Sequence, residues 1–373
     1  MLSELVGDDS RATAWRWTPA LLASSLVLLT ASGARAQAPA PLPPVTVGGG
    51  VQTAYVHDSP DGGESTDRFE LVTVRLYVNG PVTNKINFTF NTEYDGIGGT
   101  SPNEKNRLIV LDAIGRFEYS PKFNVWAGRF LPPSDRANLY GPYYAHHWNV
   151  YTSGEGVQDG YPFMAVGRDN GVAYWGQFDK VKVSGGIFDG PSTTGSNTPV
   201  EAGRIMVDFW DPEPGYYLNS TYYGAKNLLA VGLAGQVQGT DKTAWSVDFL
   251  LEKKLGGGSA FTVESEYADY DKLGGYNGNY GNDKGAYVLG SYLFPSVTGA
   301  PGKFEILGKF AKANYSKGLN PVDVDYSQKT TEVNFNYIIK DFNARVMIFY
   351  LDKRFNAVGV NDKQFGVGLQ LQM

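Results

Sequence analysis

Cysteine is absent from this chain of 373 residues, and histidine occurs only three times, at His57, His146 and His147. Without cysteine the chain can form neither disulfides nor thiolate metal sites. His146 and His147 are adjacent, and neighbours in an extended chain point to opposite faces, so one ion cannot easily bind both. The sequence therefore predicts no metal site and no cofactor.

A long apolar run is also missing from most of the chain. After the N-terminal segment, no stretch approaches the roughly 20 apolar residues that a membrane-spanning helix needs. The mean hydropathy of -0.27 shows that the chain is too polar for a bundle of such helices. The net charge of -6 leaves no excess of basic residues that would bind nucleic acid. In a membrane, the chain would have to cross as a closed β-barrel, whose strands satisfy each other's backbone hydrogen bonds.

Residues 1–36 have the layout of a secretory signal peptide. Two arginines precede a short apolar run over residues 20–30, and Ala34-Arg35-Ala36 matches the small-x-small cleavage pattern. A membrane anchor is the alternative, but the run is too short to span a bilayer. We expect cleavage after residue 36, export from the cytoplasm of a Gram-negative-type bacterium, and a short Pro- and Ala-rich lead-in over residues 37–44.

Residues 45–373 repeat one pattern, in which about ten residues of alternating polarity are followed by turn residues. The 24 Tyr, 20 Phe and 46 Gly suit strands and turns, and residues 331–339 and 85–93 alternate most clearly. Such repeats are the signature of a transmembrane barrel. We count sixteen strands, beginning near residues 46, 67, 85, 108, 123, 171, 181, 203, 228, 243, 259, 285, 302, 327, 343 and 363.

Short and long connections alternate between these strands, as expected for periplasmic turns and external loops. Residues 211–227 are the exception, because a strand there would make seventeen, and we expect an elaborated turn instead. A soluble β-sandwich would show the same alternation, but the signal peptide, even count and loop asymmetry favour an all-β, antiparallel barrel in the outer membrane, in contact with its lipid. Interfacial aromatic girdles are expected from Trp126, Tyr174, Phe178, Trp245 and Tyr350.

The longest connection, residues 131–170, follows the fifth strand and is the third external loop. Forty residues without a strand need a reason, and an inward fold that narrows the lumen supplies one. The alternative is a surface loop packed by its own aromatic residues. The residues predicted at the constriction are Arg129, Arg136, His146, His147 and Arg168.

Charged residues on the polar strand faces are expected to line the lumen. Arg75 and Arg345 each stand between apolar neighbours that occupy the other face. An arginine facing lipid at the midplane would cost about 2–4 kcal/mol. The mixture of signs leaves the ion selectivity open. The residues predicted to line the pore are Arg75, Arg116, Lys309, Arg345, Glu93 and Asp112.

Catalysis is not expected. His57, Asp58 and Ser59 could suggest a catalytic triad, but Asp and Ser beside Pro60 are typical of turns, and the chain has no Gly-x-Ser-x-Gly elbow.

The sequence predicts a porin that passes small hydrophilic solutes or ions. The alternatives are a plugged structural or adhesive barrel and an outer-membrane hydrolase.

Residues 127–133 read AGRFLPP and resemble the entry into the third loop in the phosphate-selective porin O and P family. Residues 209–213, FWDPE, are similar to a segment found mid-barrel in its relatives. The resemblance implies a sixteen-stranded homotrimeric porin with inward-folded third loops and an anion or phosphate preference. Arg129 is the position carried over from the motif. The third loop offers Arg136, His146 and His147 where the family has a lysine cluster.

Overall fold

A computed structural model describes the chain over residues 44–95, 107–148, 167–190, 198–273, 281–297, 299, 301–316, 325–356 and 361–373. The expected signal peptide and most of the lead-in lie outside these residues. The first eight strands are β1 (Thr46–Pro60), β2 (Thr66–Pro81), β3 (Ile86–Asp95), β4 (Arg107–Ser120), β5 (Phe123–Phe130), β6 (Asp169–Phe178), β7 (Val181–Phe188) and β8 (Val200–Asp208). The other eight are β9 (Leu228–Gln238), β10 (Lys242–Lys254), β11 (Ala260–Asp271), β12 (Asn282–Leu293), β13 (Lys303–Tyr315), β14 (Tyr326–Lys340), β15 (Ala344–Asn356) and β16 (Asp362–Gln372).

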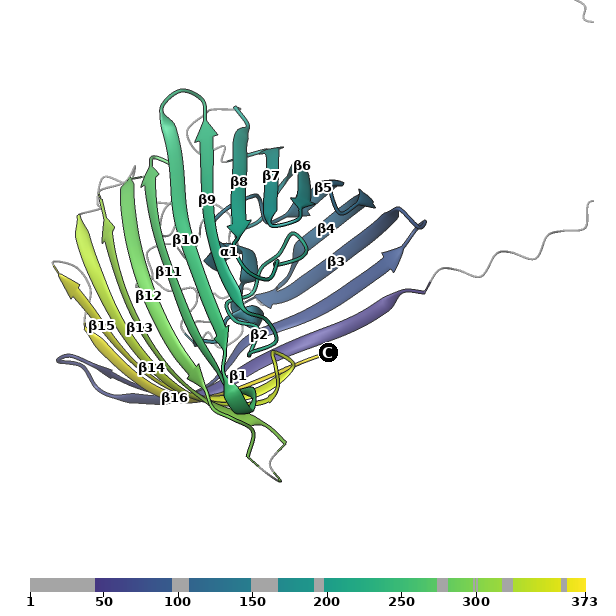
Figure 1. Cartoon of the computed structure of the whole chain (residues 1–373). Coiled ribbons are helices and arrows are strands. Elements are labelled where there is room, and N and C mark those ends of the chain that lie inside the picture. The colour runs from purple at the N-terminus through teal and green to yellow at the C-terminus, as the bar shows by residue number, and fades with distance from the viewer. Residues whose placement is uncertain are drawn as a thin grey trace, which may run out of the picture. The chain divides into compact units, whose positions relative to one another are not determined.

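The sixteen strands close into one antiparallel barrel (Figure 1), in which β1 pairs with both β2 and β16. This confirms the predicted fold class and strand count. Every predicted strand start lies within three residues of the observed one, with the largest differences at β8 and β12, predicted at 203 and 285 and observed at 200 and 282. Closure removes the open sheet edges that would otherwise invite aggregation.

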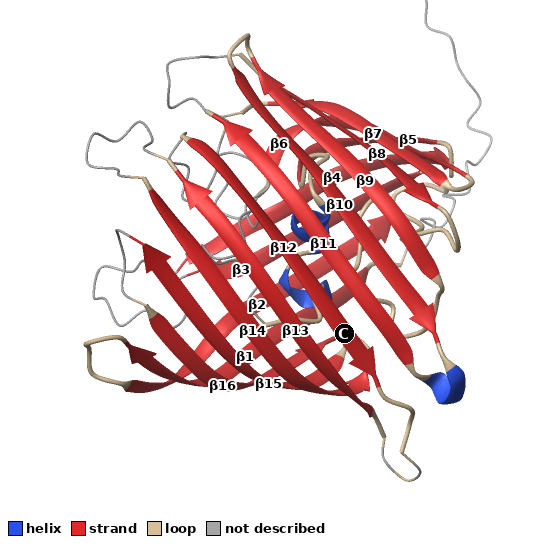
Figure 2. Cartoon of the chain, turned by 60° about the vertical axis from the view of Figure 1, so that its left-hand side comes forward, coloured by secondary structure: helices blue, strands red, loops and turns tan. Residues whose placement is uncertain are grey.

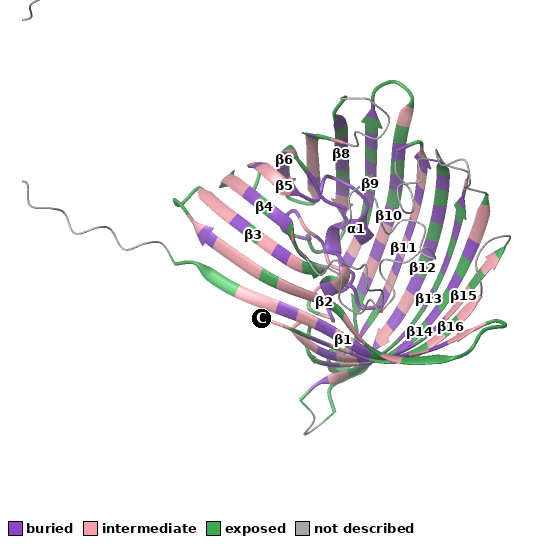
Figure 3. Cartoon of the chain, turned by 180° about the vertical axis from the view of Figure 1, so that it is seen from behind, coloured by how far each residue is buried: buried purple, intermediate pink, exposed green. Residues whose placement is uncertain are grey.

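Side chains alternate between the two faces along each strand, as Figure 3 shows by bands of buried and exposed residues. On β14, Val333 and Phe335 are exposed on the outer face, whereas Glu332 and Asn334 are buried inside. Because the period of a strand is two, each strand presents one apolar and one polar surface. Of the residues predicted for the girdles, Trp245, Tyr350 and Phe178 are exposed on the outside, and Tyr174 is half-buried.

Trp126 contradicts the girdle prediction, because it lies on the inner face of β5 and is 4% exposed. Its ring packs against Trp175 and Tyr216, at centroid distances of 5.9 and 4.8 Å, and its indole nitrogen donates to Glu118 at 3.2 Å. An indole with a hydrogen-bond partner is stable in a buried site. Aromatic composition alone does not tell which face of a strand a ring occupies.

Two connections enter the barrel from its opposite ends. The third loop, residues 131–168, joins β5 to β6, and its described part includes α1 (Arg136–Tyr140) and a 3-10 helix, Pro142–Tyr144. The β8–β9 segment, residues 209–227, contains no strand, in agreement with the predicted elaborated turn. Figures 1 and 2 show α1 inside the barrel wall. The two segments meet where the Ser220 amide donates to the Tyr144 carbonyl at 3.1 Å.

No helix among the residues described here is long and apolar enough to cross a membrane.

Candidate functional site

The third loop is held in a fixed conformation from its first residues. The Asp135 carboxylate accepts from the Asn138 amide at 2.7 Å and caps the N-terminus of α1, a role that Asp fills well because its short side chain reaches the unpaired amides of the first turn. Gly141 ends the helix with a φ of 62°, which a residue without a side chain adopts at little cost. This short helix places Arg136 inside the barrel.

Arg136 is fully buried and joins the third loop to the β8–β9 segment. Its two terminal nitrogens donate to the Glu213 carboxylate at 3.0 and 2.5 Å, and one of them also donates to the Asn219 carbonyl at 3.0 Å. Its Nε lies 3.4 Å from Asp248 on the wall. Burial alone would raise the pKa of Glu213, but the ion pair outweighs it and leaves that pKa below its usual value. Arg136 is thus an anchor between segments.

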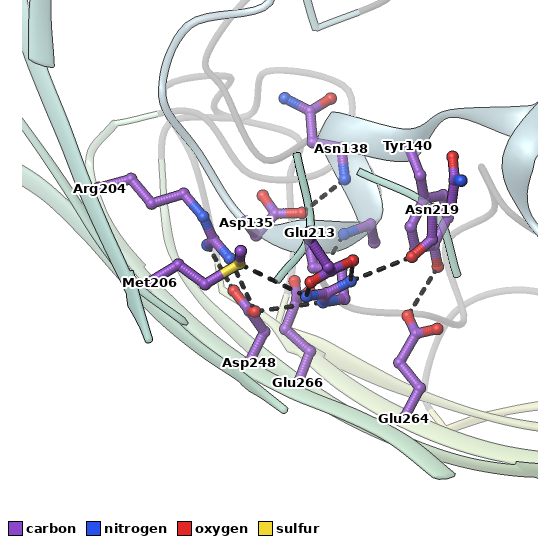
Figure 4. A network of polar contacts seen from close by, with 12 residues as sticks. Asp135, Asn138, Tyr140, Arg204, Met206, Glu213, Asn219, Asp248, Glu264 and Glu266 are labelled. Atoms are coloured by element: carbon purple, nitrogen blue, oxygen red, sulfur yellow. Dashed lines mark hydrogen bonds and ion pairs between the residues drawn. The ribbon is translucent and has the colours of Figure 1, made fainter. Parts of the chain in front are cut away.

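A cluster of buried carboxylates surrounds this anchor. Asp248 of β10 accepts from both terminal nitrogens of Arg204, at 2.5 and 2.8 Å, and Glu266 of β11 accepts from the Ala137 amide at 3.2 Å. Figure 4 shows Asp135 beside Asp248 and Glu266. Burial raises the pKa of Asp135 to about 7, although the hydrogen bond from Asn138 acts in the opposite direction. The cluster therefore holds a proton near neutral pH.

The second half of the described part of the third loop contacts the barrel wall formed by β13, β14 and β15. The His146 amide donates to Ser220 at 2.8 Å, its Nδ1 lies 3.2 Å from Glu305, and its carbonyl accepts from Asn336 at 2.9 Å. Arg345 donates to the Ala145 carbonyl. The Trp148 amide donates to Glu332 at 2.6 Å. Strands β13, β14 and β15 therefore hold this part of the loop inside the barrel.

His147 has a different environment from His146. Both of its ring nitrogens are buried and make no hydrogen bond to the described residues. Burial, with smaller contributions from Lys309, His146 and Arg345, holds the pKa of His147 well below its usual value. The ring is therefore neutral at pH 7. No group of three or more His, Asp or Glu side chains in the described part of the chain is placed to hold a metal ion.

A cavity of about 730 Å³ remains between the inserted segments and the wall formed by β1 to β5. Residues of β1 to β5 line one side, and tyrosines of the third loop and the β8–β9 segment line the other. The cavity reaches the barrel end at which β1 begins and β16 ends, because Thr46 and Gln372 also line it. The charged side chains in this lining are Arg75, Arg116, Arg168, Lys226 and Asp112.

The three arginines of the cavity are held by ion pairs on its wall. Arg168 lies 2.7 Å from Asp112, Arg75 lies 3.0 Å from Glu93, and Arg116 lies 3.8 Å from Glu118. The Arg75 guanidinium also stands over the Tyr143 ring, 5.1 Å from its centroid, a cation–π arrangement that ties the loop to the wall. The pairs fix the arginines in position along the cavity.

The predicted site residues therefore separate into distinct groups. Arg75, Arg116, Arg168, Glu93 and Asp112 come together on the wall by the cavity. Arg136, His146 and His147 are buried residues of the third loop itself, and Arg345 and Lys309 are buried on the strands that face it, with the Lys309 ammonium 4.8 Å from the Tyr287 ring centroid.

Arg129 is not brought together with the others. Its register partner on β4 is Ala113, which is exposed on the outer face, and its Nε donates to the Val110 carbonyl at 3.1 Å. Glu213 and Ser220 are the site residues that sequence reasoning missed. The signals for this segment were the unusual length of the connection after β8 and, for Glu213, its place in the FWDPE motif, but neither indicates what the turn contacts.

Solved structures with the same fold are outer-membrane proteins. OprB of Pseudomonas putida matches with a TM-score of 0.61 and 11% identity over 88% of this chain and 94% of its own. OmpF of Salmonella typhi, in complex with daunomycin, matches with a TM-score of 0.58 and 12% identity over 88% and 97%. An anion-selective porin from Comamonas acidovorans matches with a TM-score of 0.55 and 14% identity over 88% and 99%. No protein-family model and no curated protein matches the sequence. At these identities the likeness shows a porin-type barrel fold.

Proposed function

We propose that the chain is an outer-membrane porin through which small hydrophilic solutes diffuse passively. The observation that carries this proposal is the cavity of about 730 Å³ inside a closed sixteen-stranded barrel. Its lining combines charged side chains with polar residues such as Asn79 and Asn91, which suits hydrated solutes. The apolar outer face suits lipid. Residues 1–36 act as the signal peptide for export, as their sequence pattern predicts.

The preferred solutes are anions. Four cationic side chains line the cavity, namely Arg75, Arg116, Arg168 and Lys226, against one anionic side chain, Asp112. With the partner carboxylates Glu93 and Glu118 counted as well, four cations stand against three anions at this cavity. Charge at a narrow passage sets ion preference, so a positive lining favours anions. The anion selectivity named for the Comamonas acidovorans porin is consistent with this proposal. A phosphate preference and trimer assembly are parts of it that rest on the family resemblance.

Planar-bilayer recording on the refolded protein tests the proposal. Stepwise conductance is expected, with a reversal potential of anionic sign across a salt gradient and partial block by millimolar phosphate. A cation-selective reversal potential would overturn the proposed anion preference but not the proposal that the protein is a porin. Size-exclusion chromatography with light scattering on the same sample checks the trimer.

The plugged barrel is the second candidate, and a specific observation favours it. The buried ion pair of Arg136 with Glu213 locks the third loop to the β8–β9 segment across the lumen. A folded, heat-resistant barrel that gives no conductance would replace the porin with this alternative.

A further inference from the structure

Three side chains on the outer face of the barrel form a chain of hydrogen bonds that the sequence did not reveal. Ser59 Oγ lies 3.1 Å from His57 Nε2, and His57 Nδ1 lies 2.8 Å from the Asp67 carboxylate. His57 and Ser59 are two residues apart at the end of β1 and share its outer face, and Asp67 is the register partner of His57 on β2. Asp58, the acid nearest in sequence, is buried on the inner face and pairs with Arg68 instead.

We propose that Ser59, His57 and Asp67 form an esterase site at the rim of the barrel. An ionised carboxylate only accepts hydrogen bonds, so Asp67 selects the tautomer with the proton on Nδ1. His57 Nε2 is then the acceptor that faces the Ser59 hydroxyl. A nucleophile and base in hydrogen-bond contact, with a third group orienting the base, are the arrangement that acyl transfer requires. Ser59 and His57 are the catalytic residues, and Asp67 is a positioning residue.

The reaction is the hydrolysis of a carboxylic ester. Ser59 Oγ attacks the carbonyl carbon while His57 Nε2 takes the hydroxyl proton, and the C–O bond to the alcohol breaks as His57 returns that proton to the leaving oxygen. Water then attacks the acyl-serine and loses a proton to His57. Cleavage of the acyl–Oγ bond releases the acid, and the proton returns to Ser59. The net reaction consumes one ester and one water and produces one acid and one alcohol.

Two groups adjoin the position at which negative charge would develop on the carbonyl oxygen. The Ser65 hydroxyl lies 3.2 Å from Ser59 Oγ, and Lys363 of β16 is the register partner of Ser59. A hydroxyl and an ammonium can both stabilise an oxyanion. Lys363 is exposed, so its flexible side chain can approach the ester.

The substrate class follows from the surface beside the three residues. Tyr55 and Phe69 lie next to His57 and Asp67 on the same outer face, with ring centroids 5.4 Å apart, and Phe69 is 84% exposed. Phe365 of β16 is the register partner of His57 and is 48% exposed. This apolar strip runs down the barrel from the polar rim. A long-chain acyl ester in the surrounding lipid would place its chain on the strip and its ester at Ser59.

Fluorophosphonate labelling and ester hydrolysis test the site in the folded full-length protein in detergent micelles. The wild type is expected to be labelled at Ser59, identified by peptide mass spectrometry, and to hydrolyse p-nitrophenyl laurate faster than p-nitrophenyl acetate. Ser59→Ala should abolish labelling and reduce laurate hydrolysis to the rate of empty micelles. Ser265→Ala, which removes an outward-facing serine of β11, is the matched control and should behave as the wild type.

The positioning role of Asp67 is tested by a hydrolysis rate that a conservative substitution should partly restore, which a purely structural role would not predict. Asp67→Asn should lower the laurate rate about 10²- to 10⁴-fold, the range that general acid–base catalysis contributes, whereas Asp67→Glu should restore part of it. Heat-modifiable migration on gels verifies that each variant is folded. An unlabelled Ser59 in the folded wild type, or equal hydrolysis by wild type and Ser59→Ala, would overturn the proposal. Equal rates on the two esters would overturn the long-chain substrate. None of these readouts depends on conductance.

Discussion

Arg136 and Glu213 form a buried bidentate ion pair, although their segments enter the barrel from opposite ends. Each side chain is fully enclosed. The pair joins two residues that are 77 positions apart in the chain. Because a desolvated charge without a partner is costly, the two segments stabilise each other's position inside the lumen.

Glu213→Gln should destabilise the barrel by about 3 kcal/mol. Removing one partner of a buried ion pair typically costs about 3–5 kcal/mol, and the nearby Asp248 carboxylate keeps the cost at the lower end. Urea unfolding followed by tryptophan fluorescence measures the change. Glu201→Gln, an exposed position on β8, is the control and should have almost no effect. Equal stability of Glu213→Gln and wild type would show that the ion pair does not hold the segments.

Arg168→Ala should shift the reversal potential toward cations. The substitution removes a guanidinium from the cavity and leaves Asp112, its partner at 2.7 Å, without compensation. One charge acting over about 4 Å in water is worth about 1 kcal/mol, or about a fivefold change in the permeability ratio. Arg129→Ala is the matched control, because that arginine lies on the outer face. A shift in the control equal to that in Arg168→Ala would contradict the assignment of the passage to the β1–β5 wall.

Replacing residues 137–148 with a short Gly-Ser linker should raise the single-channel conductance. These residues cross the lumen and bond to the walls through contacts such as those of His146 and Trp148, so their removal widens the cavity. Single-channel recording measures the effect. Replacing residues 295–297, which are exposed in the connection after β12, controls for damage by loop replacement. Unaltered conductance in the loop variant would show that ions take a route the loop does not narrow.

Asp135→Asn should make stability less dependent on pH. The pKa of Asp135 rises from 3.8 to about 7 because the group is buried, so the folded state binds the proton more tightly than the unfolded state. The stabilising effect of that proton is complete below about pH 4 and is lost as the pH rises to about 7. Asparagine keeps the helix cap without the charge. At pH 8 the variant should therefore be more stable by about 2–4 kcal/mol.

Unfolding titrations at pH 5 and pH 8 measure this difference, which should be smaller at pH 5. Asp241→Asn, which changes an exposed carboxylate between β9 and β10, is the control and should show the same stability change at both values. A pH profile of Asp135→Asn parallel to that of the wild type would show that another group holds the proton.

Much of the fold could be predicted from the sequence because alternation with a period of two is a local property. Residues 331–339 reveal by themselves which side chains share a face, and turn residues mark where each strand ends. Repetition of this pattern sixteen times, with connections of alternating length, indicated a closed antiparallel barrel. The cavity-lining residues Arg75 and Arg116 were found by the same rule, since each lies on the polar face of its strand.

Positions near a strand end were harder to assign. Arg129 was expected at the pore constriction from its charge and its place in the AGRFLPP motif, yet it belongs to the outer face of β5, where its guanidinium reaches a backbone carbonyl near the rim. Polarity predicts the inner face only where lipid excludes charge on the outer one. Trp126 was predicted on the outer face because tryptophan is common at membrane interfaces. A tryptophan with a hydrogen-bond partner is equally stable inside, and Trp126 has such a partner in Glu118.

The sequence by itself determined the strands and most of their faces, because these depend on neighbours one or two residues apart. It indicated closure only indirectly, through the even number of strands, since closure itself pairs β1 with β16. Only the tertiary structure decided what fills the lumen and what meets on the outer face. Arg136 finds Glu213, and His57 finds Asp67 instead of the adjacent Asp58, because strand pairing and loop insertion bring together residues that chain connectivity keeps apart. A side chain's partners follow from distances in space, and no local pattern encodes those.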